Sequence, residues 1–153
     1  MNIKIKRIPS RKQTPMRNQS GTLHIDNQYV CDTEENILTA LPAGNYRICR
    51  HHCKQYGRHM PIILPASPTA GHTPDCSQCR QLEYVSLNTP MPCQCPMLRG
   101  GNGVHHLTDG SIILGTRSKA GGCLIHPLKA FNPLAERIRK ALKRGTAITL
   151  AIQ

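Results

Sequence analysis

The chain has 153 residues and a formal net charge of +12, from 20 Lys and Arg against 8 Asp and Glu. This length suits one ordinary domain and is too short for two. Four Tyr, one Phe and no Trp argue against a broad aromatic surface for stacking single-stranded bases. No stretch reaches the roughly 20 apolar residues of a membrane span, and the basic start lacks the apolar run of a signal peptide. We therefore expect cytoplasmic synthesis without a signal peptide, and leave the final location open, with a virion or the cell envelope as candidates.

Eleven of the twelve net charges come from two segments. Residues 1–17 hold six basic residues before any acid, and residues 129–144 hold six basic residues against one acid, Glu136. A basic face attracts polyanions such as nucleic acid or an anionic cell-wall polymer. The alternative is an ordinary solvated surface, because a charge count specifies little by itself.

The first third of the chain is predicted to be rich in β structure. Isoleucines alternate with lysines over residues 2–8, as in a strand. Residues 21–31 indicate a hairpin with its turn at residues 26–27. Residues 41–44 (LPAG) predict a turn into a further strand around Ile48.

The middle of the chain has a different composition. The stretch Pro61–Pro96 holds seven of the twelve prolines and four of the eight cysteines, so regular structure is not expected through most of it. Only residues 82–87 have the pattern of a short strand. We interpret residues 65–100 as an irregular Cys- and Pro-rich insertion within a single domain that spans residues 1–153.

The last third is predicted to alternate strands with one helix. Buried strands are expected at residues 111–114 and 123–125, and a closing strand at residues 147–152. Together with the first third, these elements predict a mainly β (β-rich α+β) fold with one C-terminal helix.

That helix is expected at residues 133–144. Asn132 is a suitable N-cap, Pro133 suits the first helical position, and Gly145 ends the helix. Its apolar stripe consists of Leu134, Ile138, Ala141 and Leu142.

Four segments resemble a family found in phages and their bacterial hosts that is catalogued as a domain of unknown function. Residues 21–26 (GTLHID) and 31–35 (CDTEE) are similar to its GTLYIDG and CYTLED motifs. Residues 41–48 (LPAGNYRI) resemble its IPAGTYRI motif, and residues 57–61 (GRHMP) resemble its GRxxP motif. The match covers most of the chain.

In its second half this family carries HPGN and DTEGCILVG motifs, whose His and Cys resemble the H…SxGC signature of L,D-transpeptidases. The corresponding segment is residues 105–115 (HHLTDGSIILG). The resemblance implies an L,D-transpeptidase-like fold, with Ser111 at the position of the nucleophilic Cys and His105 or His106 as its base. The chain departs from the family in lacking HPGN and the Cys, and a serine alcohol needs a well-placed base to attack an amide at neutral pH.

Cys123 is a second candidate nucleophile. Residues 118–125 (SKAGGCLI) also resemble an SxGC motif and keep the transpeptidase spacing to the following helix. However, Ile125 stands where that motif usually continues with Arg. A lone Cys in an apolar run is more often a small buried hydrophobic residue. His126 lies nearby in sequence.

Six of the eight cysteines form three close pairs. Zinc takes four soft ligands in a tetrahedron, and two close pairs brought together by a loop supply them. The predicted ligands of a structural zinc ion are Cys76, Cys79, Cys93 and Cys95. The reserve set is Cys49 and Cys53, aided by His51 or His52. Disulfides are the competing explanation, with about 105 pairings for eight cysteines, so no pairing follows from the sequence.

Two functions are consistent with these features. The first is a non-enzymatic or degenerate binding component of a cell wall or virion, with peptidoglycan, an anionic cell-wall polymer, nucleic acid or another phage or host protein as its partner. The alternative is an active peptidoglycan acyl-transferase or hydrolase that uses Ser111 or Cys123 with a nearby His. The loss of HPGN and of the family Cys favours the first.

Overall fold

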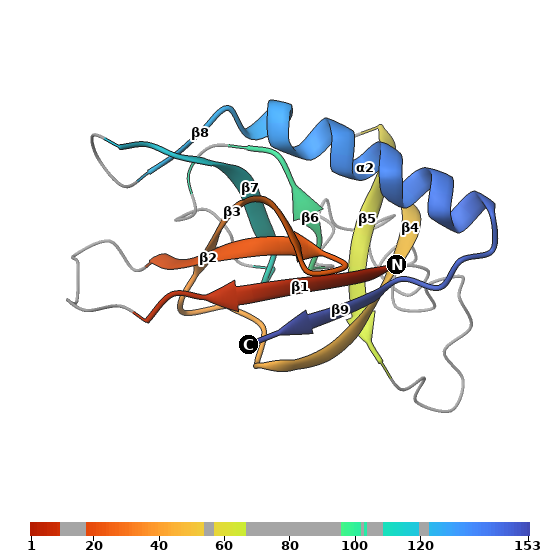
Figure 1. Cartoon of the computed structure of the whole chain (residues 1–153), viewed down its shortest axis with the longest axis horizontal. Helices are drawn as coiled ribbons and strands as arrows, with labels where there is room; N and C mark the ends of the chain where they lie inside the picture. Colours follow the sequence, from red (N-terminus) through yellow and green to blue (C-terminus); the bar gives the residue numbers. More distant parts are fainter. Residues whose placement is uncertain (10–17, 54–56, 67–95, 102, 104–108, 120–122) are drawn as a thin grey trace, which may run out of the picture.

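The computed structural model describes residues 1–9, 18–53, 57–66, 96–101, 103, 109–119 and 123–153. These residues form a mainly β structure with one helix near the C-terminus, as the sequence predicted (Figure 1). The elements are β1 (Asn2–Arg7), β2 (Asn18–Ile25), β3 (Gln28–Asn36), β4 (Gly44–Cys53), β5 (Arg58–Pro65), β6 (Leu98–Arg99), β7 (Ile112–Arg117), β8 (Leu124–Ile125), α2 (Pro127–Lys143) and β9 (Thr149–Ile152).

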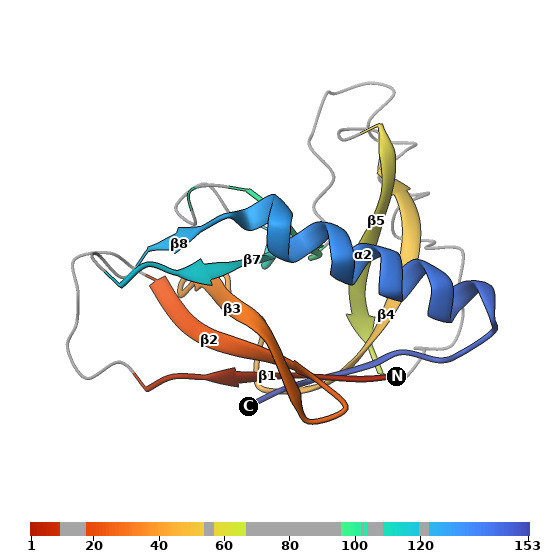
Figure 2. The ribbon, with the colours of Figure 1, turned by 45° about the horizontal axis from the view of Figure 1, so that its top comes forward.

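The strands form one sheet in the order β5-β4-β9-β1-β2-β3-β7-β6, and β8 also pairs with β7. The C-terminal strand β9 lies between β1, to which it is parallel, and β4, to which it is antiparallel. At the two ends of this order, the Ile63 N–H donates to the Pro96 carbonyl at 2.8 Å, and Ile62 pairs with Met97. The sheet therefore curves until it is nearly closed (Figure 2).

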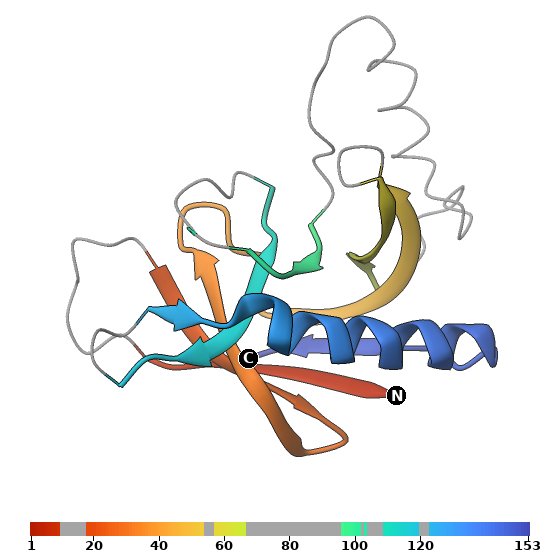
Figure 3. The same cartoon turned by 90° about the horizontal axis from the view of Figure 1, so that it is seen from above.

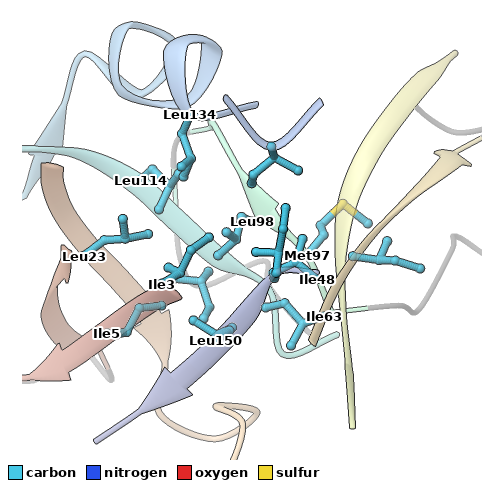
Figure 4. Packing of buried hydrophobic residues seen from close by; sticks show 14 of the residues in the cluster. Ile3, Ile5, Leu23, Ile48, Ile63, Met97, Leu98, Leu114, Leu134 and Leu150 are labelled. Carbon is cyan, nitrogen blue, oxygen red and sulfur yellow. The ribbon is translucent and has the colours of Figure 1, made fainter. Parts of the chain in front are cut away.

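The hydrophobic core lies inside this curved sheet (Figure 4). Alternate residues of the strands point into it, such as Ile3 and Ile5 of β1, each at most 1% exposed. Helix α2 lies across the sheet and contacts β7 most extensively, with smaller contacts to β4, β5 and β6 (Figure 3). Its buried residues Phe131, Leu134 and Ile138 complete the core.

The predicted hairpin is confirmed. β2 and β3 are antiparallel, and Ile25 pairs with Gln28, which leaves a two-residue turn. Asp26 and Asn27 have φ angles of 48° and 68°, the left-handed conformation of a type I′ turn, which Asp and Asn tolerate. Strands β1, β4, β7 and β9 also occupy segments that the sequence predicted as strands.

The helix begins six residues earlier than predicted. It spans Pro127–Lys143, with His126 as N-cap and Pro133 inside the helix. The additional turns bury Phe131 at 3% exposure. Gly100 allows Phe131 to pack closely against the backbone, because an added Cβ at residue 100 would lie 3.2 Å from the Phe131 Cβ. The packing of this end of the helix thus stabilises it by more than the loss of the backbone hydrogen bond that Pro133 cannot make.

The predicted end of the helix at Gly145 is confirmed. Gly145 has a φ of 72°. Its N–H donates to the Leu142 carbonyl and the Thr146 N–H donates to the Ala141 carbonyl, both at 3.0 Å, which is the Schellman pattern. No helix in the part of the chain that the structure describes is long and apolar enough to cross a membrane.

The Pro-rich stretch and the predicted insertion have regular structure at their ends. Residues 61–65 belong to strand β5. Met97 and Leu98, which the sequence assigned to the insertion at 65–100, are both 0% exposed in the core. The predicted strand at residues 82–87 lies outside the described residues.

Strand β5 accommodates two prolines for a geometric reason. Amide directions alternate along a strand, and the Ile63 N–H points away from β4 toward the Pro96 carbonyl. Pro61 and Pro65 are each two residues from Ile63, so their missing N–H groups fall on that same side. The hydrogen bonds between β4 and β5 are therefore preserved.

We expect Leu150→Ala in β9 to lower the free energy of unfolding by about 2–5 kcal/mol, because it leaves a cavity at a position that is 0% exposed. Gln153→Ala changes an exposed side chain nearby and should alter the free energy by less than about 0.5 kcal/mol. Urea unfolding followed by circular dichroism measures both. Equal, small effects would show that β9 contributes little to stability.

Candidate functional site

Ser111, the first predicted nucleophile, directly precedes β7 and is 1% exposed. Its Oγ accepts a hydrogen bond from the Met97 N–H at 3.2 Å. Its own N–H donates to Asp109 Oδ1 at 2.9 Å. The hydroxyl thus satisfies a buried main-chain donor, as buried polar groups generally do.

The segment before Ser111 is tightly packed. Gly110 has a φ of 74°, and a Cβ at this position would lie 3.0 Å from the Thr39 carbonyl oxygen, so both backbone conformation and space favour glycine. Asp109 Oδ2 lies 4.0 Å from Arg99 Nη1. The surroundings of Ser111 are therefore fixed by close backbone contact and an ion pair.

A buried ion pair lies beside Ser111. The next residue, Ile112, is the register partner of Glu35 on β3. The Glu35 side chain is 1% exposed and accepts hydrogen bonds from Arg7 Nε and Nη2, both at 2.9 Å. Arg7 also donates to the Leu41 carbonyl. The hydrogen bonds from Arg7 to Glu35 raise the pKa of the guanidinium, so Arg7 remains charged in this bidentate pair.

Sequence reasoning did not single out Arg7 or Glu35 as a pair. The available signal was alternation along β3, which places Cys31, Thr33 and Glu35 on one inward face. All three are at most 4% exposed. The buried Thr33 Oγ1 has no hydrogen-bond partner among the described residues. Gly21 makes room for it, because an added Cβ would lie 2.7 Å from that oxygen.

A second charged cluster lies at the other end of β7. The Arg117 N–H donates to Asp32 Oδ2 at 2.7 Å. The Arg117 Nη1 atom lies 3.4 Å from Glu34 Oε1, and the Glu34 side chain is 7% exposed. Acids of β3 thus pair with Arg7 of β1 and with Arg117 of β7.

Cys123 lies near this far end of β7, away from Ser111. The Ser118 N–H donates to the Cys123 carbonyl at 2.9 Å and closes the connection between β7 and β8. Seven residues of extended chain separate Ser111 from Ser118, which corresponds to about 20 Å. The two candidate nucleophiles therefore belong to different sites.

The predicted strand at residues 123–125 is present, but its predicted burial is wrong. Cys123 is exposed and Ile125 is 40% exposed. The two-residue strand β8 pairs with β7 outside the main core, so only Leu124 packs, against Ile113. His126, the helix N-cap, is also exposed.

The other predicted site residues lie outside the described part of the chain. They are His105, His106, Cys76, Cys79, Cys93 and Cys95. Of the reserve zinc set, only the half-buried Cys49 has a described side chain. The described residues contain no group of three or more His, Cys, Asp or Glu that could hold a metal ion. Zinc and disulfides remain predictions.

Two thiols have contrasting environments. Cys31 is 4% exposed, and burial, assisted by the negative charge of Asp32, raises the pKa of its thiol to about 12. Cys123 is exposed. Because the thiolate is the nucleophile, Cys31 is inert at neutral pH and Cys123 is the accessible thiol of the two.

No protein-family model, curated protein or solved structure matches the chain. The fold and site define a mainly β protein whose nearly closed sheet is covered by one helix and holds a buried serine at the start of β7. Its function is inferred from these residues and their contacts.

Glu35→Gln should lower the free energy of unfolding by about 3–5 kcal/mol, because it leaves a largely buried Arg7 charge unpaired. Glu136→Gln, which breaks a surface ion pair on α2, is the control and should leave the urea midpoint nearly unchanged. Adding Arg7→Met to Glu35→Gln should restore much of the lost stability. Without that recovery, the unpaired charge is not the cause of the loss.

Alkylation should distinguish the two described thiols. With iodoacetamide at pH 8, we expect Cys31 to react at least about 100-fold more slowly than Cys123, because its thiol stays protonated and buried. Peptide mass mapping gives the two rates. In denaturant the rates should become similar, and comparable rates in the native protein would contradict the burial of Cys31.

Proposed function

We propose that this chain is a non-enzymatic binding component of a cell wall or virion, built on a degenerate L,D-transpeptidase-like site. The observation that carries the proposal is the state of Ser111. At the position of the family nucleophile, its hydroxyl is buried and accepts a main-chain hydrogen bond from Met97.

Acyl transfer requires the attacking atom to come within about 3–3.5 Å of a carbonyl carbon. The hydroxyl of a residue that is 1% exposed offers a peptide substrate no such approach. A serine also needs a base aligned on its hydroxyl. The Asp109 carboxylate instead accepts the Ser111 N–H, so it orients the backbone and does not activate the hydroxyl.

The resemblance to the phage-associated family supports peptidoglycan, or an anionic polymer attached to it, as the partner. Another phage or host protein is the second class of partner consistent with a virion component. In this proposal the Cys-rich segment would be held by zinc or by disulfides, either of which can replace a missing core in a Pro-rich segment.

The enzymatic alternative is favoured by one observation, the exposure of Cys123. An accessible thiol beside the start of a helix can act as a nucleophile if a base lies within hydrogen-bond reach. In that case Cys123, and not Ser111, would attack the stem peptide.

Incubation with muropeptides and with intact sacculi tests the proposal. We expect co-sedimentation of the folded protein with sacculi and no cross-linked or cleaved product by mass spectrometry. Ser111→Ala should keep the binding, although loss of the Met97 acceptor lowers stability by about 1–3 kcal/mol.

Product formation that disappears in Cys123→Ser or in folded Ser111→Ala would replace the binding proposal with the enzymatic alternative. Absence of both product and co-sedimentation would remove the cell wall as the partner.

A further inference from the structure

Helix α2 has two chemically different sides. Phe131, Leu134 and Ile138 face the core. Successive residues of an α-helix are rotated by about 100° around its axis. On this basis five cationic residues lie on the opposite side, within an arc of about 120° and along about 22 Å of the axis. These residues, all exposed, are Lys129, Arg137, Lys140, Lys143 and Arg144, and together they are named the basic face of α2.

One acid interrupts the basic face. Glu136 accepts hydrogen bonds from Arg139 at 2.5 and 2.6 Å and lies 3.7 Å from Lys140 Nζ. The hydrogen bond from Arg139 lowers the pKa of Glu136 to about 2, so the carboxylate is charged at neutral pH. In the described part of the chain, no ion pair is made by Lys129, Arg137, Lys143 or Arg144.

We propose that the basic face of α2 binds duplex DNA through its phosphates, without regard to base sequence. This function is separate from the cell-wall binding proposed above. Lys and Arg contacts to phosphates position a protein on DNA and carry no sequence information. The scarcity of aromatic residues, four Tyr and one Phe in the whole chain, favours a duplex over unstacked single strands.

Charge density favours DNA over an anionic wall polymer. Duplex DNA carries one charge per about 1.7 Å of its axis and holds condensed counterions, whose release drives the binding of cations. The row of cations is about 22 Å long, and the same length of duplex carries about 13 phosphate charges on its two strands. A polymer with one charge per sugar or polyol repeat has a lower charge density and gains less from the same side chains.

The first test removes charge from the basic face. A 20-bp duplex of arbitrary sequence serves as probe, and fluorescence anisotropy gives its affinity from low to physiological salt. We expect the double variant Arg137→Gln/Lys143→Gln to reduce the slope of log affinity against log salt by about 2, and to weaken binding about tenfold or more.

The matched control removes two charges elsewhere. Lys4→Gln/Lys6→Gln changes β1 on the face opposite the buried Ile3 and Ile5, and should weaken binding less than about threefold. Circular dichroism verifies that both double variants are folded. An equal loss in the two double variants would mean that net charge alone drives binding, and would overturn the proposal.

The second test is a substitution that should increase the affinity for the duplex. Glu136→Gln removes the only acid of the helix and releases Arg139 and Lys140 from their ion pairs. We expect binding to become about 3- to 10-fold tighter at fixed salt, a gain that unfolding cannot produce. An unchanged or weaker affinity would contradict a role for this face.

A poly(glycerol phosphate) probe separates the two classes of polyanion. Binding of that polymer without binding of the duplex would assign the basic face to a wall polymer and overturn the DNA proposal. Absence of duplex binding even at low salt would also overturn it. Neither result affects co-sedimentation with sacculi, so the two proposals fail separately.

Discussion

The pairing of the C-terminal strand with both β1 and β4 is the constraint on which the rest of the structure depends. Without β9, the β4–β5 hairpin would lose its pairing to the group that runs from β1 to β6 and would keep the contacts of Ile62 and Ile63 with Met97 and Pro96. Residues of β9 also belong to the core, since Leu150 and Ile152 are at most 2% exposed. The final residues of the chain therefore connect segments that precede them by more than a hundred positions. The continuity of the sheet between β1 and β4 follows from that connection.

The basic residues of the chain fall into two physical groups. Arg7 and Arg117 contact carboxylates of β3 that are almost fully buried, Glu35 and Glu34. There the low dielectric makes an unpaired charge costly, so each acid has a specific partner. The cations of α2 instead extend into solvent, where only Glu136 offsets them. The net charge of +12 thus includes an exposed excess on the helix, whereas the buried ion pairs cancel and add nothing to it.

Strand β7 connects the features that bear on function. It has β3 on one side, β6 and β8 on the other, and α2 against it. Because it carries Ser111 before its start and leads toward Cys123 after its end, the two nucleophile candidates are held in separate environments. One is buried and hydrogen-bonded to the main chain, whereas the other is exposed. A binding role is consistent with this arrangement, since the Ser111 hydroxyl is buried and accepts a main-chain hydrogen bond.

The sequence by itself determined the local features: the mainly β character, the Asp26-Asn27 turn and the helix end at Gly145. Each depends on the preferences of a few adjacent residues, such as tolerance of positive φ. Only the tertiary structure decided the start of α2 and the burial of Ser111 and Glu35. The helix start depends on packing of Phe131 near Gly100, and the buried oxygens depend on Met97 and Arg7, which approach from distant segments. The periodicity of apolar residues indicates which side of a helix or strand is buried. Which distant segment packs on that side depends on how the whole chain folds, and no local sequence pattern specifies it.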